Sequence, residues 1–444
     1  MQSLQPKTVF ISSFHSIISR NILGTPLLSF LKNKNVGVVI LVPQKKKDFF
    51  AEEFKEFGVI VEGIDTGLRW QDVFLRYLFL AVLKTHTLNI KRKTEMRGRG
   101  KWLAAVLGNN STARKALRRI NAILTPHNTF KDLFKKYSPD LVFSTDAQNE
   151  IDVRLLADAK RNGIHTIGMV RSWDNLTAKG LVRIIPSELI VHNEIMKDEA
   201  FAFHDIPEEK IKVIGIPHYD RYFQGAHSGR EEFMKRIGAN FEKKLILFAP
   251  TGDRYIHKNT VDKEALEILD KNIGEEYQIL VRFPPADMVS GLDGRENNSR
   301  FIFDRPSRRF KVLKNTELTK EEDAHLIDSI YWSDLVVAGP STLCVDAAVF
   351  NKPVVLVGFD GYEKRSYYQS IRRYYDYNHF DPILKSGGVK LAENVESFTE
   401  FVRAYLKDPS LDERGRQMIV RRECWNADGK ATERLGNILV SNFK

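Results

Sequence analysis

Four consecutive residues, Gly339, Pro340, Ser341 and Thr342, follow a short apolar stretch and precede a segment predicted to be helical. The unpaired N–H groups and the macrodipole at the start of a helix attract anions, and Gly339 lets a phosphate approach the backbone closely. Ser341 or Thr342 can cap the helix and offer a hydroxyl to the same phosphate, and Asp346 follows in the helix. The pattern predicts a phosphate site, with an ordinary strand-to-helix turn as its alternative.

A second group of polar residues follows a predicted strand at 245–249. Thr251 and Gly252 supply a hydroxyl and an accessible backbone, which suit a phosphate or a sugar, and Arg254 can bind a diphosphate through two parallel hydrogen bonds. Arg282 ends the next predicted strand, so we expect it at the same edge of the sheet. These residues predict a second part of the phosphate site; an ordinary turn with an exposed arginine is the alternative.

Apolar segments rich in Val and Ile alternate with amphipathic segments along both halves of the chain, as is typical of parallel strands joined by helices. The strands expected in the first half are 8–12, 36–42, 59–64, 141–144, 166–170, 188–192 and 211–214. Those expected in the second half are 245–249, 278–282, one that ends before Gly339 and one within 351–360. The expected fold is α/β, with two Rossmann-like doubly wound parallel-sheet domains whose ligands bind in the cleft between them.

The pattern restarts near residue 244, after a Gly-containing connection at 215–229. We expect an N-terminal domain at 1–205, which carries a basic helical insertion at 68–136. A C-terminal domain is expected at 206–407, followed by final helices at 408–444.

The composition of the 444-residue chain, 43% hydrophobic and 28% charged, is typical of a globular protein. Cys344 and Cys424 are the only cysteines, which argues against a disulfide framework or a cysteine-based zinc site. Asp346 and Asp360 are isolated carboxylates, so we expect no metal site. No apolar run has the length of a membrane span and 9–14 is too short for a signal peptide, so the expected location is cytoplasmic.

The positive charge of the chain is concentrated in one segment. Residues 84–136 contain fourteen Lys or Arg against Glu95 and Asp132, whereas the whole chain has a net charge of +11. The apolar run 73–83 precedes this segment, and an apolar helix followed by a basic one suits the surface of an anionic membrane. Residues 73–136 therefore predict peripheral contact with the inner face of the cell membrane. A core helix with a solvated basic face is the alternative, and we expect no nucleic-acid partner because no reading motif is present.

Several motifs of the second half together resemble a known family. They are Ala249-Pro250-Thr251 with a following Arg, the Arg282-x-x-Pro285 strand end, Gly339-Pro340-Ser341-Thr342 with Asp346, and Asp428-Gly429-Lys430-Ala431-x-x-Arg434. From 244 to 442 the chain resembles the nucleotide-binding half of the GT-B glycosyltransferases, and most of all the branch shared with the CDP-glycerol glycerophosphotransferases of teichoic-acid assembly. One position departs from this resemblance, because the teichoic-type enzymes carry a His where this chain has Pro284.

The resemblance implies that the activated donor lies against the second domain, that the acceptor lies against the first, and that the final helix crosses back to the first domain. Sugar transfer then needs a base for the acceptor hydroxyl and groups that stabilise the departing diphosphate. Asp146, Asp174 and His15 are the candidate bases; a helix N-cap, a turn former and a loop histidine are their respective alternatives. The helix start at Ser341, with the two arginines named above, is the candidate for the diphosphate.

Polar residues around Asp174 are expected on the acceptor side, where Trp173 would stack on a sugar or fill the edge of the domain. These acceptor-side candidates are Arg171, Ser172, Trp173 and Asn175.

These observations predict a metal-independent GT-B glycosyltransferase with no cofactor, which uses a nucleotide-sugar donor as substrate and a lipid-linked or cell-surface polysaccharide acceptor. Three alternatives stay open. The chain could be a CDP-glycerol-type glycerophosphotransferase, a sugar-nucleotide 2-epimerase, or a non-catalytic protein that docks on a membrane or nucleic acid.

Overall fold

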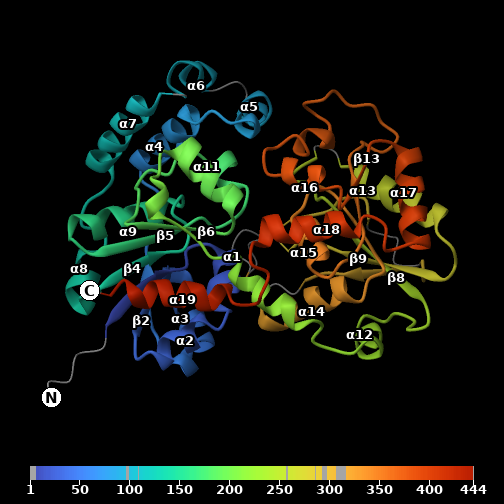
Figure 1. Ribbon diagram of the computed structural model, residues 1–444, viewed down its shortest axis with the longest axis horizontal. Helices are drawn as coiled ribbons and strands as arrows, with labels where there is room; N and C mark the ends of the chain where they lie inside the picture. Colours follow the sequence, from blue (N-terminus) through green and yellow to red (C-terminus); the bar gives the residue numbers. More distant parts are fainter. Residues whose placement is uncertain are drawn as a thin grey trace. The chain divides into compact units, whose positions relative to one another are not determined.

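The computed structural model describes residues 7–96, 100–108, 110–256, 259–285, 287–292, 298–306 and 317–443, with the backbone alone at Ile17 and Ser19. The chain divides into two compact units, Met1–Asp220 with Cys424–Lys444 (unit 1) and Arg221–Glu423 (unit 2). Each unit is built around one parallel sheet flanked by helices (Figure 1). The predicted α/β class with two Rossmann-like doubly wound domains is confirmed.

The sheet of unit 1 has seven strands among the described residues, all paired in parallel, in the order β3-β2-β1-β4-β5-β6-β7. The strands are β1 (Thr8–Ser12), β2 (Gly37–Pro43), β3 (Ile60–Ile64), β4 (Leu141–Ser144), β5 (His165–Met169), β6 (Glu188–Val191) and β7 (Ile211–Val213). The direction of the strand order reverses between β1 and β4, so the loops after these two strands flank the position where such folds bind ligands.

Apolar residues cover both faces of this sheet, because successive side chains of a strand point to opposite faces. Val9 and Ile11 of β1 pack in one core with α2 (Leu27–Asn33) and α19 (Ala431–Ser441), whereas Phe10 packs in another with α8 (Lys131–Tyr137) and α9 (Glu150–Arg161). The other helices that flank the strands are α1 (Ser16–Ile18), α3 (Lys47–Glu53), α10 (Asn175–Ala178) and α11 (Glu194–His204).

Four helices lie between β3 and α8, within the segment 68–136 that was predicted to be a basic helical insertion; these four helices are called the insertion below. They are α4 (Trp70–Val82), α5 (His86–Lys93), α6 (Lys101–Leu107) and α7 (Ser111–Leu124). Leu75, Phe79, Leu88 and Leu117 bring α4, α5 and α7 together in a small core of their own. Arg97 and Arg99, which belong to the basic segment, lie outside the described residues. Within the described stretches, no helix is long and apolar enough to cross a membrane.

The sheet of unit 2 has six described strands, all parallel, in the order β10-β9-β8-β11-β12-β13. The strands are β8 (Lys244–Ala249), β9 (Tyr277–Arg282), β10 (Phe301–Asp304), β11 (Leu335–Ala338), β12 (Val354–Val357) and β13 (Lys390–Ala392). The helices are α12 (Arg230–Arg236), α13 (Val261–Asn272), α14 (Lys320–Tyr331), α15 (Leu343–Val349), α16 (Asp381–Ser386), α17 (Val395–Lys407) and α18 (Glu413–Ile419). Here the strand order reverses between β8 and β11. Thr251 lies in the loop after β8, and Gly339 directly follows β11.

The division into units differs from the predicted boundaries of 1–205, 206–407 and 408–444. The first boundary lies at Asp220, because β7 pairs in parallel with β6 and so belongs to the sheet of unit 1. The second lies at Glu423, because α18 packs against α15 and α16 of unit 2. Among the helices after residue 407, only α19 packs in unit 1 among the described residues, where it lies beside α2 (Figure 1).

The segment that enters α19 is held to unit 1 by polar contacts. The Asp220 carboxylate accepts hydrogen bonds from the backbone N–H groups of Ala431 (2.9 Å) and Thr432 (2.7 Å) at the start of the helix. Arg434 pairs with Asp428 (Nη1–Oδ2 2.9 Å) and donates to the carbonyl of Ile214 (2.8 Å). The pairing of Asp428 with Arg434 thus has a structural role within unit 1.

Candidate functional site

Polar and charged residues gather at the carboxyl edge of the sheet of unit 1. His15 follows β1, Lys46 follows β2, Asp146 follows β4 and Arg171 follows β5. These are four neighbouring strands, so their loops meet at one edge of the sheet. Lys179, at the end of α10, completes the group, which we call the His15 cluster: His15, Lys46, Asp146, Arg171 and Lys179.

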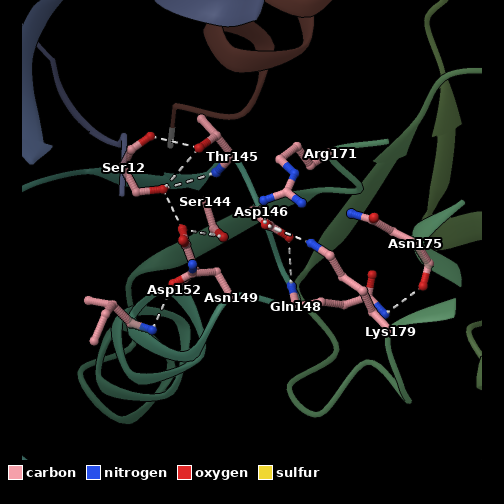
Figure 2. Close-up of polar contacts among 11 residues, drawn as sticks. Ser12, Ser144, Thr145, Asp146, Gln148, Asn149, Asp152, Arg171, Asn175 and Lys179 are labelled. Atoms are coloured by element: carbon pink, nitrogen blue, oxygen red, sulfur yellow. Dashed lines mark hydrogen bonds and ion pairs between the residues drawn. The ribbon is translucent and has the colours of Figure 1, made fainter. Parts of the chain in front are cut away.

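Asp146 pairs with two cations of the His15 cluster, Arg171 and Lys179 (Figure 2). Its Oδ2 lies 2.9 Å from Arg171 Nη1 and 3.2 Å from Lys179 Nζ, and the side chain is 1% exposed. Burial alone would raise the pKa of this carboxyl, but the charges of Lys179 and Arg171 outweigh that effect and lower it. Asp146 is therefore ionised at neutral pH and paired with two cations.

His15 carries no charge at neutral pH. Burial lowers the pKa of its imidazole to about 4, and the positive charges of Arg171, Lys179 and Lys46 contribute, while Asp146 acts in the opposite direction. A neutral imidazole can accept a proton from a hydroxyl. Three cations act on His15 against the single carboxylate of Asp146, so the His15 cluster favours an anionic ligand.

Arg171 also has unused hydrogen-bonding capacity. Its Nε is buried and has no hydrogen-bond partner among the described residues, although its Nη1 is paired with Asp146. An unsatisfied guanidinium N–H is costly to bury unless a ligand or water completes it. This unpaired N–H supports the expectation that a ligand binds beside Arg171 and accepts a hydrogen bond from it.

A second carboxyl, Asp152 on α9, lies next to this cluster and was not found from the sequence. It accepts hydrogen bonds from the hydroxyls of Ser12, at the end of β1, and Ser144, at the end of β4 (Ser144 Oγ–Oδ1 2.9 Å; Figure 2). Thr145 in turn donates from its N–H to Ser12 Oγ (3.0 Å) and from its hydroxyl to the Ser12 carbonyl (2.7 Å). Burial and the charge of Asp146 raise the pKa of Asp152 to about 8, so it is largely protonated at neutral pH and joins the two strands where their order reverses.

The remaining candidates of unit 1 are residues 172–175, two of which interact with Lys179. Asp174 precedes α10 and Asn175 is its first residue; with its amide oriented to satisfy both neighbours, Asn175 accepts from Lys179 Nζ (3.1 Å) and donates to Asp174 Oδ1 (3.1 Å). Trp173 is partly buried and packs against an apolar cluster that includes Leu189 and Val191 of β6, and Ser172 is partly exposed. The structure therefore brings His15, Asp146 and Arg171 together, while Asp174 and Asn175 support Lys179.

The two turns predicted to hold a phosphate in unit 2 pack against each other. A Cβ at Gly339 would lie 2.0 Å from Thr251 Oγ1, so only glycine fits there without a shift. Gly252 has φ +92°, which favours glycine as well. The loops after β8 and β11 thus meet where the order of this sheet reverses.

The backbone of the first turn differs from the expectation that it is available to a phosphate. The N–H groups of Thr251 and Gly252 donate to the Asp262 carboxylate at 2.8 and 3.0 Å, and Asn259 Nδ2 donates to it at 2.6 Å. Burial raises the pKa of Asp262 despite these donors. Both amides are committed within the fold, so any ligand contact here must come from the Thr251 hydroxyl or from other residues.

The second turn keeps more of the predicted features. Ser341 Oγ accepts from the N–H of Leu343 (3.2 Å) at the start of α15, whereas Thr342 is exposed and caps no N–H. Pro340 is partly exposed, and Asp346 is buried within α15. Ser341 therefore takes the capping role. The Thr342 hydroxyl forms no capping hydrogen bond that would compete with a ligand.

The two arginines predicted to bind a diphosphate differ in their surroundings. Arg282 is 9% exposed and forms an ion pair with Asp304 at the end of β10, with Glu322 3.7 Å from its Nη2. Two carboxylates thus already oppose its charge, so its part in holding a diphosphate stays a prediction. Arg254 is exposed, and its backbone N–H donates to Asp287 (3.1 Å). Throughout the described ranges, no cluster of three or more His, Cys, Asp or Glu is arranged to hold a metal ion.

Comparison with known proteins identifies relatives of two kinds. The chain is 26% identical over 237 residues to the UDP-N,N'-diacetylbacillosamine 2-epimerase (hydrolyzing) of Legionella pneumophila, covering 52% of this chain and 59% of that protein. It is 23% identical over 276 residues to the teichoic acid poly(ribitol-phosphate) polymerase of Bacillus spizizenii, covering 57% of this chain and 37% of that protein. The matches thus span less than two thirds of either relative.

Solved structures share the fold over nearly the whole chain. The UDP-GlcNAc 2-epimerase of Methanocaldococcus jannaschii superposes with a TM-score of 0.56 at 14% identity, covering 98% of this chain and 99% of that one. Structures of glycosyltransferases share the same fold. The fold is therefore the GT-B type that the sequence predicted.

The family match is more specific than the fold. The profile of the CDP-Glycerol:Poly(glycerophosphate) glycerophosphotransferase family matches residues 168–441, which is more than half of the chain. This range includes Arg171, Lys179 and every candidate of unit 2, and it begins after His15 and Asp146. The chain belongs to the CDP-Glycerol:Poly(glycerophosphate) glycerophosphotransferase family, whose members are transferases.

Proposed function

We propose that this protein is a glycosyltransferase that moves a sugar from a nucleotide-sugar donor to a lipid-linked or cell-surface glycan acceptor. The observation that carries the proposal is the His15 cluster, in which a neutral imidazole lies among three cations and one carboxylate. A neutral base and an excess of positive charge suit a reaction in which a hydroxyl loses a proton close to phosphate groups.

In this mechanism the acceptor binds to unit 1, where His15 takes the proton of the attacking hydroxyl. A new bond forms between the acceptor oxygen and the anomeric carbon of the sugar, and the bond from that carbon to the diphosphate oxygen breaks. The nucleoside diphosphate leaves with the bonding electron pair. Asp146 holds Arg171 and Lys179 in place, and the positive charge that remains on His15 after proton transfer is stabilised by Asp146.

The donor is assigned to unit 2, where the turn at Gly339 and the exposed Thr342 and Arg254 are the candidate contacts of the diphosphate. The fixed positive ends of peptide dipoles and the arginine charge would supply the electrostatic stabilisation that a metal ion gives in other transferases. No cofactor is part of this proposal.

Transfer of glycerophosphate from CDP-glycerol is a second candidate, and the family match over 168–441 favours it. Against it, Pro284 stands where the teichoic-type enzymes carry a His. A hydrolysing 2-epimerase is a third candidate, which the Legionella relative favours. The three differ in what they consume, because an epimerase converts its sugar nucleotide without any glycan acceptor.

A donor screen separates these functions. Thermal unfolding is followed with UDP-, GDP- and CDP-linked sugars and with CDP-glycerol, since a ligand that binds only the folded state raises the melting temperature. Donors that bind are then incubated with and without a lipid-linked glycan, and the products are identified by mass spectrometry. Acceptor-dependent release of a nucleoside diphosphate supports the proposal. Release of CMP from CDP-glycerol, or sugar conversion without acceptor, would replace it with the second or third candidate.

The role of His15 is tested with a matched pair of variants. His15→Gln should lower turnover by about 10²–10⁴-fold, the usual contribution of a general base, with little change in donor affinity. His127→Gln alters an exposed histidine of the same unit and should leave turnover unchanged. Equal activity of the two variants would remove His15 from the mechanism.

A further inference from the structure

The insertion in unit 1 exposes unusually large apolar side chains. Trp70 of α4 is 70% exposed, Trp102 of α6 is 73% exposed and Ile123 of α7 is 73% exposed. All three helices precede residue 168, so they lie outside the part of the chain that the family profile matches.

The exposed residues of α4 form one continuous stripe. Trp70, Val73, Phe74 and Tyr77 are spaced three and four positions apart, which places them on a single face of the helix. The opposite face, with Leu75, Phe79 and Val82, packs in the small core of the insertion. The helix is therefore apolar on both faces, although only one of them is buried in the fold.

The two neighbouring helices repeat this arrangement. On α6, Trp102 and Val106 lie one turn apart, and both are exposed. On α7, Ile120 and Ile123 are exposed, whereas Leu117 faces the core. Both α6 and α7 pack against α4, so the three helices lie side by side at one end of unit 1 (Figure 1).

The basic residues of the insertion divide into two classes. Arg92 is buried and donates to the carbonyls of Leu80, Ala81 and Leu83 at the end of α4. Arg114 forms two hydrogen bonds to Asp205, at 2.7 and 2.6 Å, and Arg118 donates to backbone carbonyls. Arg92 thus closes the end of α4, whereas Arg114 and Arg118 attach α7 to the rest of unit 1. The remainder of the described basic residues on α6 and α7, namely Lys101, Lys115 and Arg119, are exposed beside the apolar side chains.

We propose that the exposed face of α4, α6 and α7 docks on the surface of an anionic lipid bilayer. Trp, Tyr and Phe favour the level of the lipid headgroups, and Lys and Arg bind the lipid phosphates. The mixture of large aromatic and basic side chains matches the chemistry of that surface better than an apolar protein interface, in which lysine is depleted. This docking does not depend on which group the enzyme transfers.

The test uses the full-length protein and two kinds of vesicle, one of phosphatidylcholine alone and one of phosphatidylcholine mixed with phosphatidylglycerol. The protein should sediment with the anionic vesicles and much less with the neutral ones, and added salt should weaken binding because it screens the exposed charges. Tryptophan fluorescence should shift to the blue on binding in the wild type. This shift should be much smaller in Trp70→Ser/Trp102→Ser.

Two sets of variants locate the surface. Trp70→Ser/Trp102→Ser/Ile123→Ser and Lys101→Gln/Lys115→Gln/Arg119→Gln should each lower the partition onto anionic vesicles by about tenfold or more. The matched control, Lys235→Gln/Lys271→Gln/Lys407→Gln, removes as many exposed basic residues from unit 2 and should bind like the wild type. Unchanged melting temperatures show that the variants are folded, as expected for exposed positions.

Several results would overturn the proposal. They are equal binding to neutral and anionic vesicles, wild-type binding by both variant sets, or an equal loss in the unit 2 control. Loss of self-association in the apolar variant, with vesicle binding intact, would assign the face to a second copy of the chain. Salt-sensitive binding of single-stranded nucleic acid without vesicle binding would assign it to nucleic acid.

Discussion

Arg171 and Asp146 join the ends of two neighbouring strands, β5 and β4, through an ion pair of 2.9 Å between Nη1 and Oδ2. Lys179 shares the same carboxylate oxygen, so one buried negative charge holds two cations at the edge of the sheet. The positive charges of Arg171 and Lys179 are therefore balanced by Asp146, whichever substrate binds there.

Asp146→Asn should destabilise the protein by about 3 kcal/mol, because it leaves two largely buried cations without their counter-charge. The double variant Asp146→Asn/Arg171→Gln should lose less free energy of unfolding than the two single variants lose in sum, since each substitution removes the partner of the other residue. Urea unfolding of the four proteins measures this coupling. Additive losses would show that the pair contributes no interaction energy.

The imidazole of His15 should titrate near pH 4 in the absence of ligand, because burial and three cations oppose its protonation. An anion bound in the cluster would offset those cations, so a phosphate-bearing ligand should raise the pKa of His15 by about one unit or more. Carbon–proton spectra of histidine-labelled protein follow the titration, and His15→Gln assigns the signal. A pKa that does not move on addition of saturating inorganic phosphate would speak against an anion site at His15.

Asp152 makes the stability depend on pH. Its pKa is raised to about 8 in the folded protein, so the fold favours the protonated carboxyl. The stability due to this proton is complete below the unfolded pKa of about 4 and is lost as the pH rises from about 4 to about 8. Above that range no further change is expected.

Asp152→Asn removes this titration and keeps an acceptor for Ser12 and Ser144. The variant should therefore gain stability relative to the wild type between about pH 5 and about pH 8, by up to about 1.4 kcal/mol for each pH unit. Guanidinium unfolding at several pH values measures the difference. A constant difference across this range would show that Asp152 is already ionised in the folded state.

Gly339→Ala should destabilise unit 2 by about 1–3 kcal/mol, because the added methyl group overlaps the Thr251 side chain. Thr251→Ala removes the hydroxyl that the methyl group meets, so the double variant should recover most of the loss. Melting temperatures of the single and double variants test this compensation. If the double variant is no more stable than Gly339→Ala alone, the two turns do not meet as described.

Thr342→Ala should weaken binding of the donor nucleotide by about tenfold without lowering the melting temperature, because the hydroxyl is exposed and caps no N–H. Ser341→Ala is the matched comparison, and it should lower both, since Ser341 also accepts from Leu343. Isothermal titration with the donor found in the screen provides the affinities. Wild-type affinity in both variants would remove this turn from the donor site.

Strands rich in Val and Ile were predictable, whereas two short strands were not. Residues 301–304 and 390–392 form β10 and β13, which are only four and three residues long and contain no run of Val and Ile, so they were not predicted. Their place in the sheet comes from pairing with the longer strands β9 and β12.

The candidate site was predictable in part from residues that follow strands. Asp146 and Arg171 were predicted to lie at the edge of the sheet because the carboxyl ends of parallel strands meet there, whereas His15 was named only as a candidate base. Lys179 and Asp152 reach the same edge from helices, and their positions depend on how α9 and α10 pack. Asp262, on α13, likewise accepts hydrogen bonds from the backbone N–H groups of Thr251 and Gly252. It therefore competes with a phosphate for these groups, which no local motif could reveal.

The return of α19 to unit 1 bears on how the protein is made. Leu435 and Leu439 belong to the core that β1 and α2 begin, yet more than two hundred residues of unit 2 are synthesised in between. The N-terminal sheet must leave the ribosome with part of its apolar surface uncovered, and unit 2 can fold before that gap is filled. Unit 1 is therefore completed only after unit 2 has been synthesised, and a stop codon shortly before Ala431 would damage the unit whose translation begins first.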